Sequence, residues 1–426
     1  MDEDAVFRRY DIRGNYPGEI DTGFAEILGR ALGSLAVRDH RGRTVVTKDT
    51  KDSSGELKSA LVRGIMSAGA EVLDAGTGPT DYTAFTGREK DSVAVQVTSS
   101  HLPMDNNGFK MMYPSGNSFV NEDLDRLKQL FRNRDFESGE GSLTPVAEEA
   151  RGDYRDRVLE IVERLGHGRE REVVLETMAG AASEFLPDLL GDTGLDVRDL
   201  SSRIDPPEPS PERLGHVEQE VSGDQIGLAC DMDADRVAAY FDGRWLDGNE
   251  LMAVLGKLSG ASEVVASVDT SATVEDYLDA EFTYTRVGDP FVLSAMQETG
   301  AGFSGEPNGH YAFADLVTYS SGTLSALLLA SADLGPILEE IPDTEVRKDS
   351  VEVRDREKAM QRVKDQVEDR FEVLSTKDGV KFRAGDAEVL IRPSGSSSLL
   401  RVVSESPGVE AAENGVRLAK DMIRNG

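Results

Sequence analysis

Short apolar runs alternate with amphipathic stretches along most of the 426-residue chain. In residues 43–76, an apolar run is followed by a stretch with Leu57, Leu61 and Ile65 at helical spacing, and then by a second apolar run. This pattern predicts a strand, a helix and a second strand, which together form the βαβ unit of a parallel sheet. The apolar run at 93–97 predicts a further strand, and the polar residues after it lie where open α/β sheets bind ligands.

The alternation restarts twice further along the chain, and the last part of the chain differs. Two more α/β stretches are followed by a charged amphipathic helix near 356–370, hairpin strands and a closing helix. Hairpin strands flanked by helices favour a small α+β module. The predicted boundaries are therefore 1–145, 146–245 and 246–342 for three α/β domains, and 343–426 for the α+β module.

Charge and cysteine content narrow the class of protein. The chain has 79 acidic and 47 basic residues, a formal net charge of −32, which repels nucleic acid phosphates and anionic lipid, so neither is an expected partner. The acidic residues are spread along the whole chain, as in proteins that stay soluble in concentrated salt, and we infer a halophilic source. The single cysteine, Cys230, excludes an intrachain disulfide. Because no apolar run is long enough for a membrane span and no signal-peptide core is present, a cytoplasmic location is expected.

Two polar segments carry residues suited to phosphate or metal chemistry. The segment "TSSHLP" places Ser100 beside His101, which on its own is more often a solvated turn than a catalytic loop. The segment "CDMDADR" alternates Asp231, Asp233 and Asp235 after an apolar run, and three carboxylates brought together are costly unless a hard cation neutralises them. An EF-hand loop would need glycine at its sixth position and glutamate at its twelfth, where this chain has Arg236 and Asp242, so an EF-hand is excluded. A polar bulge between two strands remains the alternative.

Two later segments carry candidate groups for binding. The segment "IRPSGSSSLLR" places Arg392 and Arg401 around a Ser/Gly turn, which can offer backbone N–H groups and hydroxyls to a phosphate, or can be an ordinary hairpin loop. The segment "SGEPNGH" combines a carboxylate, an amide and an imidazole between glycines, which suits sugar hydroxyls but by itself fits any turn. The order of the four segments along the chain decides between these alternatives.

In that order and at appropriate separations, the segments resemble the motifs of the α-D-phosphohexomutase family of phosphoglucomutases, phosphomannomutases and phosphoglucosamine mutases. "FRRYDIRG" is similar to F-x-x-Y-D-I-R-G, "KDTKDSS" to R-D-T-R-x-S-S, and "TSSHLPMDNNGFK" to T-A-S-H-N-P followed by N-G-F-K. "DMDADR" resembles D-G-D-A-D-R, "TRVGD" resembles T-x-V-G-D, "GEPNGH" resembles G-E-x-S-G-H, and "RPSGSSSLLR" resembles R-x-S-G-T-E-P-x-x-R. The resemblance covers the whole chain.

The resemblance implies a fold and a reaction. The implied fold class is α/β with the four-domain phosphohexomutase architecture, in which three α/β domains with mixed sheets and a smaller C-terminal α+β domain surround a central cleft. The implied reaction moves phosphate between C1 and C6 of a hexose or hexosamine through a phosphoserine and a sugar bisphosphate. The resemblance further implies one Mg²⁺ per subunit, a hexose bisphosphate as the priming phosphate donor, a small phosphosugar as the partner, and a monomer or homodimer.

The resemblance also assigns roles to residues of this chain. The implied catalytic residues are the phosphorylated Ser100, His101, Lys110, which is the leading candidate for proton transfer, and Arg13. The implied Mg²⁺ ligands are Ser100, Asp231, Asp233 and Asp235. The implied substrate-binding residues are Arg236, Gly288, Asp289, Glu306, Asn308 and His310. The implied phosphate-binding residues are Arg392, Ser394, Gly395, Ser396 and Arg401.

The chain departs from the family's motifs at several positions. Ser99 replaces an alanine and Leu102 an asparagine on either side of the Ser-His pair. Asn308 replaces the usual serine of the segment "GEPNGH", and Ser321 replaces the aspartate of the D-G pair that follows this segment in the family. Two serines stand where the phosphate loop usually has Glu-Pro, and "ETMAGA" replaces D-x-G-N-G-A. These departures bear on which serine is phosphorylated and which sugar is preferred.

Two other functions remain open from the sequence. If water reached the same serine and metal, the protein would be a Mg-dependent sugar phosphatase. If the altered loops no longer supported catalysis, it would be a non-catalytic sugar-phosphate-binding paralogue. A nucleophile and a metal triad together favour catalysis, because a binding protein needs neither. The sequence therefore favours a phosphosugar mutase, an isomerase of the intramolecular phosphotransferase class.

Overall fold

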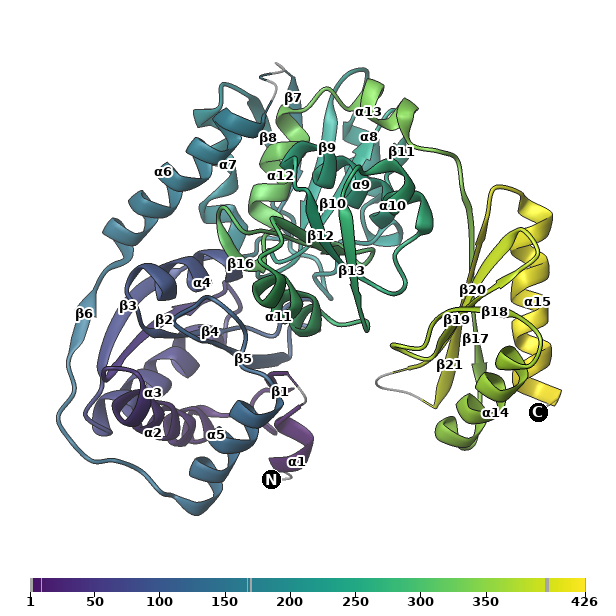
Figure 1. Cartoon of the computed structure of the whole chain (residues 1–426). Coiled ribbons are helices and arrows are strands. Elements are labelled where there is room, and N and C mark those ends of the chain that lie inside the picture. The colour runs from purple at the N-terminus through teal and green to yellow at the C-terminus, as the bar shows by residue number, and fades with distance from the viewer. Residues whose placement is uncertain (1–2, 9, 167, 169–170, 395–397, 426) are drawn as a thin grey trace.

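The computed structural model contains four separate β-sheets, each formed by a successive part of the chain (Figure 1). The structure describes residues 3–8, 10–166, 168, 171–394 and 398–425. We call each sheet with the helices around it a unit, numbered I to IV in chain order. Units I to III mix parallel and antiparallel strand pairs, and the strand pairs of unit IV are antiparallel. This confirms the predicted fold class of three mixed α/β sheets and a C-terminal α+β module.

Unit I carries a six-stranded sheet in the order β1-β5-β4-β2-β3-β6. Its strands are β1 (Ile12–Asn15), β2 (Arg43–Lys48), β3 (Glu71–Thr77), β4 (Val93–Val97), β5 (Asn106–Met112) and β6 (Leu143–Pro145). Its helices are α1 (Glu3–Val6), α2 (Thr22–Asp39), α3 (Ser54–Ser67), α4 (Thr80–Glu89) and α5 (Asn121–Asn133). The predicted βαβ unit is confirmed, because β2 and β3 pair in parallel and Leu57, Leu61 and Ile65 on α3 are buried. Since β4 also pairs in parallel with β2, the loops after β2 and β4 emerge at the same edge of the sheet.

Units II and III carry five-stranded sheets in the orders β11-β10-β9-β7-β8 and β13-β12-β14-β15-β16. Unit II contains α6 (Ala147–Leu165), β7 (Glu172–Glu176), the 3₁₀ helix η1 (Ala181–Glu184), α7 (Leu186–Asp192), β8 (Asp196–Asp199), the 3₁₀ helix η2 (Pro211–Arg213), α8 (Gly215–Glu220), β9 (Ile226–Cys230), β10 (Val237–Phe241) and β11 (Arg244–Trp245). Unit III contains α9 (Gly248–Ser259), β12 (Glu263–Ser267), α10 (Ala272–Tyr277), β13 (Glu281–Thr285), α11 (Asp289–Thr299), β14 (Phe303–Glu306), β15 (His310–Phe313), β16 (Val317–Ser320), α12 (Gly322–Ser331) and α13 (Leu334–Glu340). One cluster of buried apolar side chains runs from Val45 in unit I through Leu228 in unit II to Leu327 in unit III. The first three units therefore share an apolar core.

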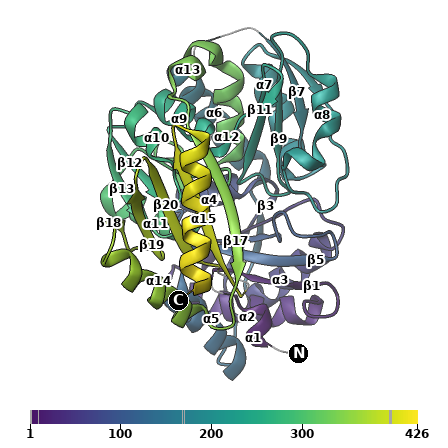
Figure 2. The same cartoon turned by 90° about the vertical axis from the view of Figure 1, so that its right-hand side faces the viewer.

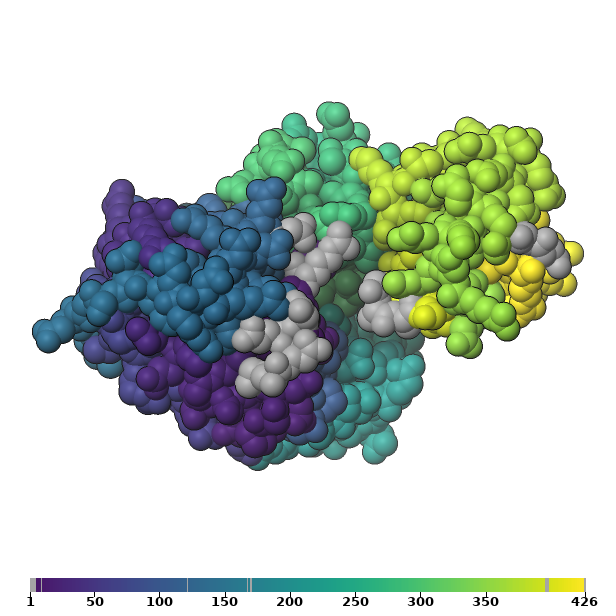
Figure 3. All heavy atoms as spheres, turned by 90° about the horizontal axis from the view of Figure 1, so that it is seen from below, coloured from purple at the N-terminus to yellow at the C-terminus, as the bar shows by residue number. Residues whose placement is uncertain are grey.

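Unit IV carries an antiparallel sheet in the order β17-β21-β20-β19-β18. Its elements are β17 (Glu345–Glu352), α14 (Arg356–Glu368), β18 (Glu372–Ser375), β19 (Val380–Ala384), β20 (Ala387–Pro393), β21 (Leu399–Ser406) and α15 (Val409–Asn425). Helix α15 lies on the outer face of this sheet, turned away from the other units (Figures 1 and 2). Among the described residues, the apolar cluster of unit IV draws on its own side chains, from Val351 to Ile423. Unit IV thus has a core of its own. Figure 3 shows that the molecular surface is hollowed between unit I and unit IV.

Unit IV is held to unit III by polar contacts. The Ala272 N–H at the start of α10 donates to the Glu405 carboxylate on β21 at 3.0 Å. The Lys377 ammonium, in the β18–β19 loop, donates to the Tyr284 carbonyl at 2.6 Å. When such a hydrogen bond breaks, its donor and acceptor can bind water instead. Each bond therefore stabilises the contact between the units by only about 1 kcal/mol.

Few large apolar side chains are exposed among the described residues. No helix within the described ranges is both long enough and apolar enough to cross a membrane. The exposed large apolar side chains are Val37, Leu143, Val373 and Val409, which come from four different elements. Single exposed apolar residues are normal on a protein surface, so these carry no functional argument. Cys230 is buried at the end of β9, and burial raises the pKa of its thiol well above the ordinary value.

The loop after β7 holds two non-glycine residues in the left-handed backbone conformation. Met178 (φ 52°) and Ala179 (φ 50°) stand where the family motif has glycine and asparagine. Glycine and asparagine adopt this conformation most readily, whereas for other residues it costs roughly 1–2 kcal/mol. The loop is fixed from outside, because the Ala181 N–H donates to the Met232 carbonyl at 2.7 Å and the Thr50 hydroxyl donates to the Ala179 carbonyl at 2.6 Å. This departure therefore stores backbone strain beside the loop after β9 that carries Asp231, Asp233 and Asp235, which we call the aspartate-rich loop.

We expect Ala179→Gly to stabilise the protein by about 0.5–1 kcal/mol. Glycine relieves the left-handed strain, and part of the gain is offset by the greater freedom of glycine in the unfolded chain. The measurement is the free energy of unfolding from denaturant titration. Ala25→Gly inside α2 is the matched control and should destabilise by about 1 kcal/mol. A lower stability of Ala179→Gly would show that the loop is not strained.

One buried carboxylate joins units I, II and III. Asp81 on α4 accepts hydrogen bonds from the Tyr154 hydroxyl on α6, at 2.7 Å, and from the Ser321 hydroxyl before α12. Ser321 is one of the departures from the family's motifs, and an aspartate there would face Asp81. Burial raises the pKa of Asp81 to about 6, although the hydrogen bonds from Ser321 and Tyr154 act in the opposite direction. At neutral pH the fold therefore buries an ionised carboxylate.

The stability of Asp81→Asn relative to the wild type should rise by about 1–3 kcal/mol between pH 5 and pH 8. The folded state holds the Asp81 proton more tightly than the unfolded state, so this carboxyl contributes stability at low pH. That contribution is lost as the pH rises from the ordinary pKa of 3.8 to about 6. Asparagine cannot ionise, so the stability of the variant relative to the wild type should fall as the pH falls from 8 to 5. Unfolding free energies of both proteins at these two pH values test this, and a stability difference independent of pH would contradict it.

Candidate active site

A cavity of about 220 Å³ lies where units I, II and III meet. The predicted site residues that line it are Arg13, Ser100, Lys110, Asp235, Arg236, Gly288, Asp289, Asn308 and His310. They come from three different sheets and from segments far apart in the sequence. The fold therefore brings candidate catalytic, metal-binding and sugar-binding residues to one place.

Ser100 lies in the loop after β4, which we call the serine loop (residues 98–106). Its backbone is left-handed, with φ 53°. The Ser100 hydroxyl donates to Asp231 Oδ2 at 2.8 Å, from unit I to unit II, and Ser100 Oγ lies 3.2 Å from His101 Nδ1. Burial, with the charges of Arg236 and Arg13, lowers the pKa of His101 to about 3, so the imidazole is neutral at pH 7. The serine loop therefore presents the Ser100 hydroxyl to the aspartate-rich loop.

The aspartate-rich loop after β9 gathers three buried carboxylates. Oxygens of Asp231, Asp233 and Asp235 all lie within 4.8 Å of one another. Burial and the neighbouring carboxylates raise the pKa of Asp231 well above its ordinary value. Lys110 on β5 reaches into the cluster, where its Nζ pairs with Asp235 and lies 2.7 Å from Asp233 Oδ2. Burial disfavours the ammonium, but Asp233 and Asp235 outweigh burial and raise the pKa of Lys110 well above its ordinary value, so Lys110 is charged.

The same loop fits a hard divalent cation. Its donor atoms are carboxylate oxygens with the Ser100 hydroxyl beside them, and oxygen ligands are the ones that Mg²⁺ prefers. Asp233 Oδ1 is buried and has no hydrogen-bond partner among the described residues. A buried carboxylate oxygen without a partner is costly, and a cation ligand would remove that cost. Ser100 and the three aspartates therefore form a suitable ligand set for Mg²⁺.

On the unit III side, the loop between β14 and β15 places Glu306, Asn308 and His310 together. Glu306 Oε1 accepts from the Gly288 N–H at 2.8 Å, whereas its buried Oε2 has no hydrogen-bond partner in the part of the chain that the structure describes. Asn308 Oδ1 accepts from the His310 backbone N–H at 3.3 Å and lies 2.9 Å from His310 Nδ1. Burial raises the pKa of Glu306 to about 7. The loop therefore leaves a carboxylate oxygen for a polar ligand.

The candidate phosphate-binding arginines of unit IV do not line the cavity. Arg392 on β20 and Arg401 on β21 are paired directly across the two strands, so their side chains share one face of the sheet. Like charges in that arrangement repel each other, and a bound anion would remove the repulsion. The Arg392 guanidinium lies 3.5 Å from Asp269 and 3.6 Å from Asp378, which compensate part of its charge.

The rest of this loop is described only in part. Ser394 is buried, its carbonyl accepts from the Arg356 guanidinium at the start of α14, and its N–H donates to the Leu399 carbonyl at 2.9 Å. Gly395 and Ser396 lie outside the described residues. The phosphate-binding role of this loop stays a prediction.

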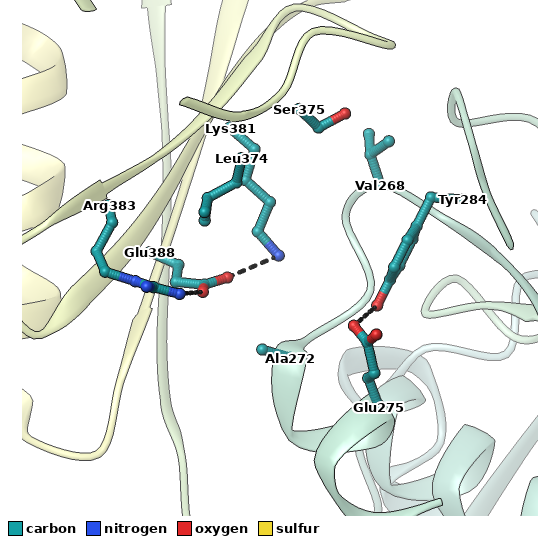
Figure 4. Close-up of a pocket in the computed structure, with 9 residues that line it drawn as sticks. All are labelled: Val268, Ala272, Glu275, Tyr284, Leu374, Ser375, Lys381, Arg383 and Glu388. Atoms are coloured by element: carbon teal, nitrogen blue, oxygen red, sulfur yellow. Dashed lines mark hydrogen bonds and ion pairs between the residues drawn. The ribbon is translucent and has the colours of Figure 1, made fainter. Parts of the chain in front are cut away.

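A second cavity, of about 240 Å³, lies between units III and IV, and none of the predicted site residues lines it (Figure 4). The Lys381 and Arg383 side chains on β19 both pair with Glu388 on β20, at 3.1 and 3.0 Å. On the opposite side, the Tyr284 hydroxyl donates to Glu275 at 2.7 Å. Because these polar groups are matched within their own units, we assign this cavity to the joint between the units and not to a ligand.

Six residues that line the first cavity were absent from the sequence predictions, namely Tyr10, Asp11, Met111, Ser118, Pro290 and Tyr319. Tyr10 belongs to the segment "FRRYDIRG", so the motif itself could have identified it. Ser118 and Tyr319 stand in segments that resemble no motif quoted for the family. Their place in the site depends on how units I and III pack, which local sequence does not encode.

Known proteins resemble this chain over almost its whole length. Family models match for the phosphoglucomutase/phosphomannomutase alpha/beta/alpha domain I over residues 4–138, domain III over 247–335 and the C-terminal domain over 350–421. A probable phosphoglucosamine mutase of Methanothermobacter thermautotrophicus is 32% identical over 434 residues, which cover 96% of this chain and 95% of the relative. A phosphoglucomutase/phosphomannomutase of Thermococcus kodakarensis is 30% identical over 458 residues, which cover 98% and 99%. The crystal structure of a phosphoglucomutase/phosphomannomutase family protein from Burkholderia thailandensis matches with a TM-score of 0.85 at 24% identity and covers 99% of this chain and 98% of its own.

Fold, site and relatives agree on an enzyme that acts on phosphosugars. The chain belongs to the α-D-phosphohexomutase family. The relatives named above are phosphosugar mutases, so the enzyme class is an isomerase that works as an intramolecular phosphotransferase.

Proposed function

We propose that the protein interconverts hexosamine 1-phosphate and 6-phosphate, with glucosamine as the preferred sugar, and that Ser100 carries the transferred phosphoryl group. The observation that carries this proposal is the contact between Ser100 Oγ and Asp231 Oδ2 at 2.8 Å. Ser100 lines a cavity that Lys110, Asn308 and His310 also line. A nucleophile, a cation site and candidate sugar ligands thus share one cavity. The phosphoglucosamine mutase named above supports the choice of sugar.

The transfer step needs a place for one phosphoryl group and one proton. The bond from phosphorus to Ser100 Oγ breaks, a bond to a sugar oxygen forms, and the proton of that sugar hydroxyl ends on Ser100 Oγ. We assign this proton transfer to Lys110, which lines the same cavity and is charged: its ammonium donates a proton to Ser100 Oγ as the phosphorus bond breaks, and the amine so formed takes the proton of the sugar hydroxyl. When bound, Mg²⁺ would offset negative charge as the phosphoryl group moves.

A second transfer in the opposite sense completes the reaction. It requires a sugar bisphosphate that turns over, so that either phosphate can face Ser100, and a hexose bisphosphate supplies the first phosphate. We assign the distal phosphate to Arg392 and Arg401, because paired guanidiniums on one sheet face suit a phosphate dianion. Glu306 and Asn308 would hold the ring hydroxyls in both orientations, since a carboxylate accepts and an amide both accepts and donates.

The cavity also favours an amino sugar on electrostatic grounds. Asp289 lines it, and one oxygen of its neighbour Glu306 has no hydrogen-bond partner among the described residues. An ammonium group on the sugar ring could donate to such carboxylates, and hydrogen bonds between charged groups are stronger than those between neutral ones.

A single assay tests the proposal. The protein is incubated with Mg²⁺, a trace of hexose bisphosphate and, separately, the 1-phosphates of glucosamine, glucose and mannose, and the products are followed by ³¹P NMR. We expect 6-phosphates, with the highest kcat/KM for glucosamine. Release of inorganic phosphate would instead indicate a phosphatase, and substrate binding without any product would indicate a binding protein.

Asn308→Ser should change the choice of sugar more than the overall rate. Serine lacks the amide, so an epimer whose hydroxyl pairs with Asn308 loses about 1–3 kcal/mol, which is roughly 5- to 150-fold in relative kcat/KM. The ratio of kcat/KM values among the three sugars is the measurement, and phosphorylation of Ser100 should persist. If every sugar changes by the same factor, Asn308 acts through His310 and not on the substrate.

A further inference from the structure

Lys51 is a buried lysine that contacts the serine loop and has no assigned role. It lies in the loop after β2, next to the serine loop at the edge of the sheet, and its exposed fraction is 2%. Its ammonium, which has three N–H groups, lies within hydrogen-bond distance of four acceptors of the serine loop. They are Ser99 Oγ at 2.7 Å and the carbonyl oxygens of Leu102 at 2.9 Å, Pro103 at 3.2 Å and Asn106 at 3.2 Å.

These acceptors depend on the ammonium. Three backbone carbonyls converge on Lys51 Nζ, and a hydrogen bond to a charged group contributes about 1.5–3 kcal/mol. The Pro103 carbonyl also accepts from the Asn106 N–H at 2.9 Å, so the ammonium adds to the contacts within the loop. Ser99 extends the contact, because its hydroxyl accepts from Lys51 and donates to the Asn106 carbonyl at 2.9 Å. Ser99 is one of the departures from the family's motif, where alanine would accept nothing. Without the ammonium, the serine loop would lose four contacts that fix it to the loop after β2.

The lysine is itself fixed from the other side. Asp49 Oδ1 accepts from the Lys51 backbone N–H at 2.9 Å and from the Ser54 hydroxyl at the start of α3. The backbone of Lys51 is therefore tied to α3, and its side chain is tied to the serine loop. Ser100 needs such external support, since its left-handed backbone is strained and persists only where the surroundings fix it.

We propose that Lys51 is a positioning residue, which holds the serine loop in the conformation that places Ser100 Oγ against Asp231. The proposal rests on the proposed role of Ser100. Lys51 does not line the cavity, among the described lining residues, so its effect reaches the reaction through the loop.

The test compares two buried lysines of unit I. Lys51→Met removes the ammonium and keeps the stem, and Lys51→Arg restores a cation. Lys58→Met is the matched control, because Lys58 on α3 is also buried and pairs with Asp74 and the Gly76 carbonyl, away from the serine loop. We expect kcat to fall about 100-fold in Lys51→Met with KM changed less than about threefold, since displacement of a reacting group by about 1 Å costs that much. Lys51→Arg should recover at least about tenfold of the loss.

Two further measurements keep the proposal decidable. Amide hydrogen exchange of the peptide that covers the serine loop should be at least about tenfold faster in Lys51→Met and unchanged in Lys58→Met. Ser99→Ala, a milder change should Lys51→Met fail to fold, is expected to lower kcat about fivefold and to be less than additive with Lys51→Met.

The outcomes separate this proposal from the proposed function. If the wild type converts no phosphosugar, the proposed function is wrong, and loop exchange alone then decides the role of Lys51. If the wild type is active and Lys51→Met loses no more activity than Lys58→Met, with equal loop exchange, Lys51 is not a positioning residue.

Discussion

Ser100→Ala should lose all measurable mutase activity, with kcat lower by at least about 10⁴-fold, the scale seen when a covalent nucleophile is removed. Alanine cannot carry a phosphoryl group, whereas the fold should persist, because Ser100 Oγ contributes only its contacts with Asp231 and His101. The measurements are ³¹P NMR of the sugar phosphates and the intact mass of the protein after incubation with glucose 1,6-bisphosphate. Wild type should gain the mass of one phosphoryl group, and Ser100→Ala should gain none.

Ser99→Ala is the matched control for the choice of serine. Ser99 Oγ accepts a hydrogen bond from Lys51 and donates one to the Asn106 carbonyl. Ser99 is not among the described residues that line the cavity. Ser99→Ala should therefore still become phosphorylated and keep part of its activity. The assignment to Ser100 is wrong if Ser100→Ala takes up phosphate and Ser99→Ala does not.

Asp233→Asn should lower activity by at least about 100-fold and weaken Mg²⁺ binding while the protein stays folded. The change removes one of three carboxylates and with it a buried oxygen, Asp233 Oδ1, that lacks a hydrogen-bond partner among the described residues. The fold should tolerate the change, because Lys110 keeps its ion pair with Asp235. Mg²⁺ affinity can be measured by isothermal titration, and folding by circular dichroism.

Asp242→Asn provides the comparison for this loss of charge. Asp242 is exposed and follows β10, so it lies beyond the strand that leaves the aspartate-rich loop. Its φ of 50° is a conformation that asparagine also adopts readily. Asp242→Asn should match the wild type in activity and in Mg²⁺ affinity. An unchanged metal dependence in Asp233→Asn would place the metal elsewhere.

Local sequence predicted those parts of the fold whose pattern repeats over short distances. Leu57, Leu61 and Ile65 at helical spacing identified α3, because burial of one helix face requires that spacing. Motif order identified Ser100, Lys110 and the three aspartates as candidates, and the fold brings them within one site although they come from two units.

Other features could not be predicted, because they depend on packing between units. Asp81 and Ser321 are 240 positions apart and meet only because α4 and α12 belong to units with a shared core. Lys51 stands in the segment "KDTKDSS", but its burial depends on the converging carbonyls of the serine loop, which local sequence does not place. The centre of the phosphate loop, at Gly395 and Ser396, lies beyond the described residues.

The separate core of unit IV has a thermodynamic consequence. Turning unit IV away from unit III would break polar contacts such as Ala272 with Glu405, while the apolar cluster of unit IV stays intact. Exposure of apolar surface raises the heat capacity, whereas exposure of polar surface lowers it by roughly half as much per unit area, so the two offset each other. Opening the molecule at this joint should therefore change the heat capacity very little. The enthalpy of opening is then nearly constant, so the logarithm of the equilibrium constant between open and closed forms follows a straight line against inverse temperature, unlike the curved dependence of unfolding.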